Sequence, residues 1–292
     1  MAHGLKLLEQ GRREDLPEAG VRFREAIEIR RAAAPTGDRW QRYNLAGSYM
    51  SLGDVLTRQG TPEELAEGGR MYDASMAIMR ELPLDGDPLF MRRLLIGCLN
   101  SGLNHLFQGP DSLADAVADF TSALGLADSA QVKAWPDRAL LAAAASANLA
   151  STELRRGNWD AAIAAAQRSA AEAAPEANVQ VGSADAAIRS RHTLLSALVS
   201  RWQKSGAPRP DPETLSASTD AAEEGLKLAK EWENKGVTWF KPLATDLFRT
   251  GAQLYAHFQP QFLAEFLGDY AGADPEMAND LIQAAIKKRL PS

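Results

Sequence analysis

The sequence of 292 residues lacks most features that would point to a particular chemistry. One cysteine, Cys98, excludes an internal disulfide or a site built from several cysteines, which is typical of a reducing compartment, so we expect a cytoplasmic protein. No apolar run reaches the ~18 residues that span a bilayer. No apolar core follows the first charges, so a signal peptide is not expected either. Alternating Val, Ile and Thr runs are also missing, which favours an all-helical fold.

The balance of charges argues against partners that are themselves strongly acidic. The chain carries 32 basic and 38 acidic residues, a formal net charge of −6. Apolar residues make up 45% and charged residues 24%, which is ordinary for a globular chain. An acidic balance argues against nucleic acid or an anionic membrane as the partner.

Glycines recur at a constant interval along most of the chain. They are Gly11, Gly60, Gly109, Gly157 and Gly206, separated by 49, 49, 48 and 49 residues. Seven residues before the first four stand small residues, namely Gly4, Gly53, Gly102 and Ala150. After each glycine, three residues recur at fixed spacing. The first is small, the second, four positions later, is large in most repeats, and the third, three positions after that, is small, as in Ala116, Phe120 and Ala123. These spacings place the three on one helix face.

The period therefore predicts helical hairpins, each with a turn at the phased glycine, because glycine tolerates the left-handed conformation that ends a helix. Neighbouring hairpins must stack to bury their apolar faces. We expect ten helices, at residues 2–10, 15–33, 38–59, 62–81, 87–107, 111–127, 136–156, 159–174, 183–205 and 212–234.

This arrangement resembles the tetratricopeptide repeat (TPR) family. Tyr49, Leu52-Gly53, Leu56 and Gly60 match the first half of its motif. The period of about 48–49 residues exceeds the family's usual 34 and resembles a longer, bacterial variety that is often fused to signalling domains. The resemblance covers residues 1–234 as five repeats. It implies a right-handed α-solenoid of antiparallel helix pairs, whose first helices line a concave groove.

Residues 235–292 form a C-terminal segment that is rich in aromatic residues and breaks the period. We expect two helices before Gly268 and a last helix with Asp274 as N-cap and Pro275 at its first position. The segment is interpreted as a helical cap over the last repeat, and a homodimer contact remains the alternative.

Motifs of catalysis are absent. There is no phosphate-binding glycine loop and no His-Glu-x-x-His pattern, so we expect no cofactor, no metal and no enzyme activity. His105 and His192 are isolated, and Cys98 lies in an apolar stretch that predicts a buried, inert thiol.

Candidate binding residues are those of the first helices that the resemblance places in the groove. Asparagine amides there could hold a peptide backbone, arginines could meet acidic groups, and apolar side chains could supply contact area. These candidates are Arg42, Met50, Arg92, Arg93, Leu99, Asn100, Leu103, Asn104, Asn148, Arg189 and His192.

The sequence thus predicts a non-catalytic scaffold or adaptor that binds a protein or peptide, in bacterial signalling or complex assembly. One alternative is a regulatory sensor subunit that binds a small molecule or a signalling peptide. Another is an enzyme with an unrecognised site, for example His192 with Arg189 and Glu153.

Overall fold

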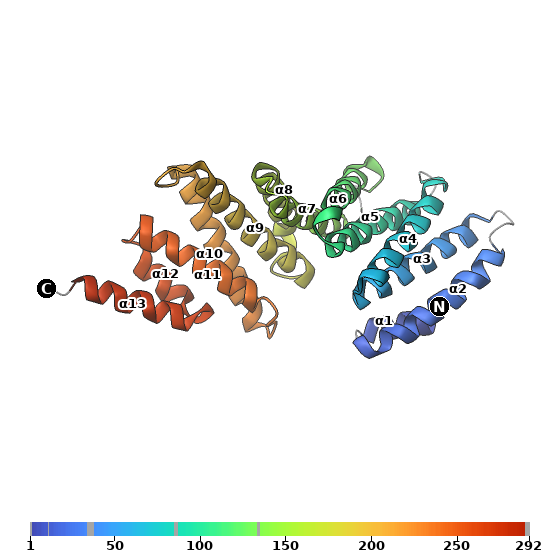
Figure 1. Cartoon of the computed structure of the whole chain (residues 1–292), viewed down its shortest axis with the longest axis horizontal. Coiled ribbons are helices and arrows are strands. Elements are labelled where there is room, and N and C mark those ends of the chain that lie inside the picture. The colour runs from blue at the N-terminus through green and yellow to red at the C-terminus, as the bar shows by residue number, and fades with distance from the viewer. Residues whose placement is uncertain (1, 11, 34–37, 85–86, 133–134, 290–292) are drawn as a thin grey trace. The chain divides into compact units, whose positions relative to one another are not determined.

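The computed structural model describes residues 2–10, 12–33, 38–84, 87–132 and 135–289, and all its regular elements are helices. The α-helices are α1 (Ala2–Gln10), α2 (Leu16–Ala33), α3 (Arg39–Gln59), α4 (Pro62–Arg80), α5 (Pro88–Gln108), α6 (Leu113–Asp128), α7 (Arg138–Arg155), α8 (Trp159–Ala173), α9 (Val181–Ser205), α10 (Pro212–Asn234), α11 (Lys241–Phe258), α12 (Leu263–Tyr270) and α13 (Pro275–Arg289) (Figure 1). Within this part of the chain, none of the helices combines the length and the apolar character that crossing a bilayer requires.

The phased glycines end helices as predicted. Gly60, Gly109, Gly157 and Gly206 have φ of 82°, 114°, 77° and 69°, in the range that glycine adopts at low cost. Gly11 lies outside the described residues. The ten expected helices are all present, with ends that differ by at most two residues.

The contacts between residues divide the chain into two compact units, Met1–Thr152 and Glu153–Ser292. This division falls inside α7. In unit 1 each helix from α1 to α5 packs on the one that follows it. In unit 2 the same holds from α8 to α11.

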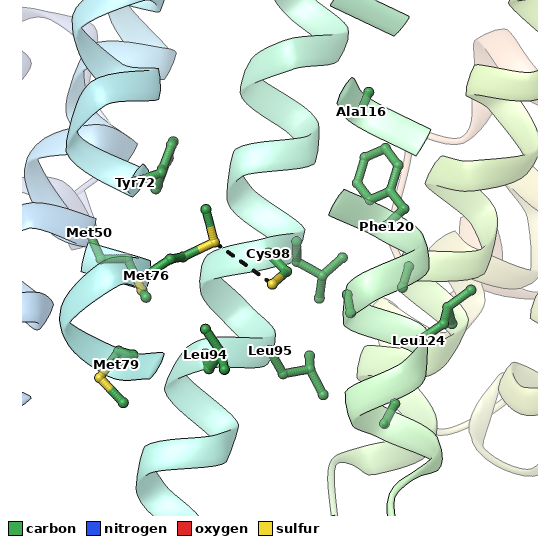
Figure 2. Packing of buried hydrophobic residues seen from close by; sticks show 14 of the residues in the cluster. Met50, Tyr72, Met76, Met79, Leu94, Leu95, Cys98, Ala116, Phe120 and Leu124 are labelled. Carbon is green, nitrogen blue, oxygen red and sulfur yellow. Dashed lines mark hydrogen bonds between the residues drawn. The ribbon is translucent and has the colours of Figure 1, made fainter. Parts of the chain in front are cut away.

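The core of unit 1 contains a methionine-rich cluster between α4, α5 and α6. Figure 2 shows Met76 and Met79 of α4 facing Leu94 and Cys98 of α5, with Phe120 of α6 on the other side. Cys98 Sγ lies 3.8 Å from Met76 Sδ, and burial raises the pKa of the thiol to about 11. The thiol is therefore buried and protonated, as the apolar stretch around it predicts.

Glycines of the first helices lie directly under aromatic rings of the second helices. A Cβ atom added at Gly53 would lie 2.8 Å from the Tyr72 ring, and one added at Gly102 would lie 2.6 Å from the Phe120 ring. Both rings are almost fully buried. In these two helix pairs, the small and large positions of the repeat are thus the two halves of one contact.

The C-terminal segment uses the same contact. A Cβ atom at Gly251 of α11 would lie 2.9 Å from the Phe266 ring of α12. The last helix begins as predicted, because Asp274 Oδ1 accepts a hydrogen bond from Met277 N at 3.2 Å and Pro275 is its first residue. One detail differs, since Gly268 lies inside α12 and does not follow it.

Candidate functional site

A pocket of about 210 Å³ opens on α3, α4 and α5 of unit 1. It is lined by Asp54, Thr57, Arg58, Tyr72, Asn100, Leu103 and Phe107. Two of these residues, Asn100 and Leu103, are groove candidates from the sequence.

Asp54 is the charged centre of the pocket. Its Oδ1 accepts one hydrogen bond from Tyr72 Oη at 2.7 Å and one from Asn100 Nδ2 at 2.8 Å. No described group donates to its Oδ2, which leaves one carboxylate oxygen for a ligand. Burial raises the pKa of Asp54 to about 6, although Tyr72, Arg58 and Asn100 act in the opposite direction. The carboxylate is therefore held in place by two donors and is only partly hydrated.

A polar chain continues from this carboxylate into the interior. Asn104 Nδ2 donates to Thr57 Oγ1 at 2.8 Å, and Asn104 Oδ1 accepts from Gln108 Nε2 at 2.7 Å. Asn104 is fully buried, and a Cβ atom at Gly68 would lie 3.0 Å from its Nδ2. Its amide therefore joins α5 to α3 and α4 and is not free to hold a peptide.

The rim of the pocket is apolar. Phe107 is 59% exposed although it lies on a helix whose other large side chains are mostly buried. Leu103, one turn earlier, is half-buried against the core. A carboxylate oxygen beside an exposed ring can accept an N–H from a ligand whose apolar group covers the ring.

The other apolar candidates lie in the core. Met50 and Leu99 are 8% and 6% exposed and pack in the same cluster as Cys98. They stabilise the contacts between helices and offer little area to a partner. Asn148 of α7 is also buried, and its carbonyl oxygen accepts a hydrogen bond from Thr152 Oγ1 at 2.7 Å.

The arginine candidates of unit 1 are engaged within the chain. Arg42 pairs with Glu81, and Arg92 Nε donates to Asp137 Oδ2 at 2.9 Å. The Arg93 guanidinium lies 3.5 Å from the centre of the Tyr43 ring and donates to Tyr43 O at 2.6 Å. Burial lowers the pKa of Arg93, so this charge is partly desolvated.

The candidates of unit 2 have separate partners. Arg189 lies 3.5 Å from Asp185, and His192 Nε2 lies 3.8 Å from Asp246. Glu153 binds Arg156 and Asn158 instead. These ion pairs differ from the catalytic grouping of His192, Arg189 and Glu153 that the sequence left open.

His105, the other histidine of the first helices, has a structural partner. His105 Nδ1 lies 3.0 Å from Asp119, and this hydrogen bond raises the pKa of His105. Among the described residues, no three His, Cys, Asp or Glu side chains are placed to hold a metal ion.

Sequence reasoning missed Asp54 and Phe107. Asp54 interrupts the apolar residues Gly53 and Val55, and Phe107 extends the apolar run beyond Leu106. Both departures from the helical pattern could have marked the pocket.

Comparison with known proteins supports the fold alone. No family model and no curated protein matches the sequence. Among solved structures, the chain is similar to BtubC (BKLC) from P. vanneervenii, with 14% identity, a TM-score of 0.57 and coverage of 95% of this chain and 94% of that one. Tom70 from yeast also matches, at 14% identity over 95% of this chain and 63% of that one, with a TM-score of 0.25.

The class of protein that these observations define is an all-helical protein built by stacking consecutive helices.

Proposed function

We propose that this chain is a non-catalytic scaffold or adaptor of the long-period TPR type, which binds a protein or peptide at the pocket on α3 and α5. Its place would be the bacterial cytoplasm, in signalling or complex assembly. The observation that carries the proposal is the pairing of the open Asp54 Oδ2 with the exposed Phe107 ring in one pocket.

The two groups have complementary roles. Asp54 accepts a hydrogen bond from a backbone or side-chain N–H of the partner, and Tyr72 and Asn100 keep its orientation without any rearrangement on binding. The Phe107 ring supplies most of the apolar contact area, as exposed aromatic residues commonly do at the centre of an interface.

The test compares two truncations of exposed apolar residues in unit 1. Phe107→Ala removes the ring at the pocket, and Ile29→Ala removes a side chain that is 72% exposed on α2, away from the pocket. Each variant and the wild type is used as bait in the source cells, with quantitative mass spectrometry of the bound proteins.

We expect a protein that the wild type and Ile29→Ala retain equally, and that Phe107→Ala binds about tenfold more weakly or more, as for a central aromatic residue. Equal recovery with both variants would exclude this pocket as the binding site. If no protein is captured, but a small molecule raises the thermal stability of the wild type and not that of Phe107→Ala, the chain is a sensor and not a scaffold.

A further inference from the structure

The size of the pocket on α3 and α5 limits what it can take. Its volume of about 210 Å³ is below the roughly 300–1,000 Å³ of sites that enclose a whole small molecule. A pocket of this size suits one side chain of a partner. The chemistry of its lining then selects which side chain that is.

The carboxylate in the pocket has no ion pair among the described residues. Asp54 is half-buried, and both of its hydrogen-bond donors are uncharged groups. Arg58, the one base in the lining, instead places its Nη1 3.5 Å from Leu8 O of α1. Burial raises the pKa of Asp54 to about 6, with Arg58 acting in the opposite direction, so the carboxylate is ionised at neutral pH but poorly hydrated. A cation entering the pocket would compensate this charge, which a neutral N–H cannot do.

The free oxygen favours an ammonium over a guanidinium. Asp54 Oδ1 already accepts two hydrogen bonds, from Tyr72 Oη at 2.7 Å and from Asn100 Nδ2 at 2.8 Å. Oδ2 is not one of the buried polar atoms that lack a partner, so it is accessible from the pocket. A guanidinium binds best with two parallel N–H groups on two carboxylate oxygens, whereas an ammonium is a point charge that one oxygen can hold. Lysine therefore fits this carboxylate better than arginine.

The rim of the pocket suits the stem of a lysine side chain. Leu103 and Phe107 follow Asn100 by three and seven residues, which places all three on one face of α5. Leu103 is half-buried and Phe107 is 59% exposed. The methylene groups of lysine cover apolar surface of this kind while the ammonium reaches a polar group. The ammonium at a chain terminus has no such stem and would bring backbone polar groups against the rim.

A metal ion does not fit the same place. Asp54 is the one acid in the lining, whereas calcium and magnesium require about six or more oxygen ligands. No three His, Cys, Asp or Glu side chains in the described part of the chain are grouped to hold a metal ion. The cation that this pocket suits is therefore organic.

We propose that the pocket on α3 and α5 recognises a lysine side chain of the partner, with its ammonium on Asp54 Oδ2 and its methylene groups against Leu103 and Phe107. The inference rests on the proposed function, which requires only that a partner binds at this pocket. It adds the chemical group that selects the partner.

The experiment uses the full ¹⁵N-labelled chain and the N-acetyl amides of lysine, arginine and norleucine. Norleucine has the four side-chain carbons of lysine without the nitrogen. Nuclear magnetic resonance titrations at low salt follow the side-chain amide of Asn100, which lies beside the carboxylate, and give each dissociation constant. The variants are Asp54→Asn and, as a matched control, Asp73→Asn, because Asp73 is an exposed acid on α4 that does not line the pocket.

We expect the lysine derivative to bind at least about tenfold more tightly than the norleucine derivative, and more tightly than the arginine derivative. Asp54→Asn should remove the difference between lysine and norleucine, and Asp73→Asn should preserve it. Equal binding of lysine and norleucine to the wild type would overturn the proposal without any variant. It would also be overturned by arginine binding as tightly as lysine, or by the lack of a saturable shift with the lysine derivative.

A third variant, Phe107→Ala, separates this inference from the proposed function. Loss of the ring should weaken the lysine and norleucine derivatives alike, because both would lie against it. If these two derivatives bind equally to the wild type and both bind more weakly to Phe107→Ala, the pocket stays the binding site and the preference for lysine is wrong.

The other source of an ammonium is tested with leucine amide, which carries it at the chain terminus. Tighter binding of leucine amide than of the lysine derivative would assign the pocket to a chain terminus and overturn the proposal. Weaker binding supports the lysine side chain.

Discussion

Replacement of Gly102 by alanine tests whether the phased small residues exist to admit an aromatic ring. The added Cβ would lie 2.6, 2.8 and 2.9 Å from three carbons of the Phe120 ring, whereas carbon atoms in contact are about 3.5–4.0 Å apart. Phe120 is fully buried in the cluster of Figure 2, so its ring has little room to retreat. Either the ring or the whole of α6 must move by about 1 Å to restore a normal contact.

The magnitude is the balance of two effects. Overpacking a core costs about 1–3 kcal/mol, and an overlap with a rigid buried ring belongs in the upper half of that range. Replacing glycine by alanine inside a helix contributes about 0.5–1 kcal/mol of stability. Gly102→Ala should therefore lower the free energy of unfolding by about 1–2 kcal/mol.

Gly125 supplies a control on the same helix as Phe120. A Cβ atom there meets nothing within 4 Å, so Gly125→Ala should raise the free energy of unfolding by about 0.5–1 kcal/mol. The same chemical change thus has opposite signs at two sites of one helix pair. Adding Phe120→Leu to Gly102→Ala should show a favourable coupling, because the smaller side chain relieves the overlap.

The assay is urea unfolding followed by circular dichroism, together with amide hydrogen exchange in α5 and α6. Stacked helix pairs need not unfold in one step, so the exchange rates give the local effect where a single transition does not. If Gly102→Ala is as stable as Gly125→Ala, the ring contact is not the reason for a glycine at this position of the repeat.

Two further predictions concern Asp54 in the pocket and Arg93, one of the candidate binding residues. Burial raises the pKa of Asp54 to about 6, above the ~3.9 of an unfolded chain, so between these values the folded state holds a proton that the unfolded state has lost. The contribution of Asp54 to the free energy of unfolding should therefore fall as the pH rises from about 4 to 6 and then stay constant. Urea unfolding at about pH 4 and about pH 6 measures this fall, and Asp54→Asn should remove it. If the variant shows the same pH dependence as the wild type, the raised pKa of Asp54 is not its cause. Arg93→Lys should cost about 1 kcal/mol, since lysine cannot both lie flat on the Tyr43 ring and donate to its carbonyl, whereas Arg92→Lys at a more exposed ion pair should cost clearly less in the same measurement.

Local signals in the sequence predicted the helices well because they act within a few residues. A glycine with positive φ ends a helix by its own backbone geometry, and all four of Gly60, Gly109, Gly157 and Gly206 have positive φ. The N-cap at Asp274 likewise depends only on a hydrogen bond to Met277, three residues on.

The roles of Asn100 and Asn104 were harder to predict because they depend on Asp54 and Thr57, which lie 46 and 47 positions away in the sequence. Asn100 and Asn104 look alike in sequence, yet Asn100 donates a hydrogen bond to Asp54 in a pocket. The amide of Asn104 instead forms hydrogen bonds with Thr57 and Gln108 in the interior. Met50 was expected to face a groove and lies in the core instead.

By itself, the sequence determined where the ten helices of residues 2–234 start and stop to within two residues, since periodic spacing and turn residues are properties of the local chain. Only the tertiary structure decided which side chains stay open to a ligand. That choice depends on which helix faces fill each other, and the open oxygen of Asp54 and the exposed ring of Phe107 are what the packing of α3, α4 and α5 leaves uncovered.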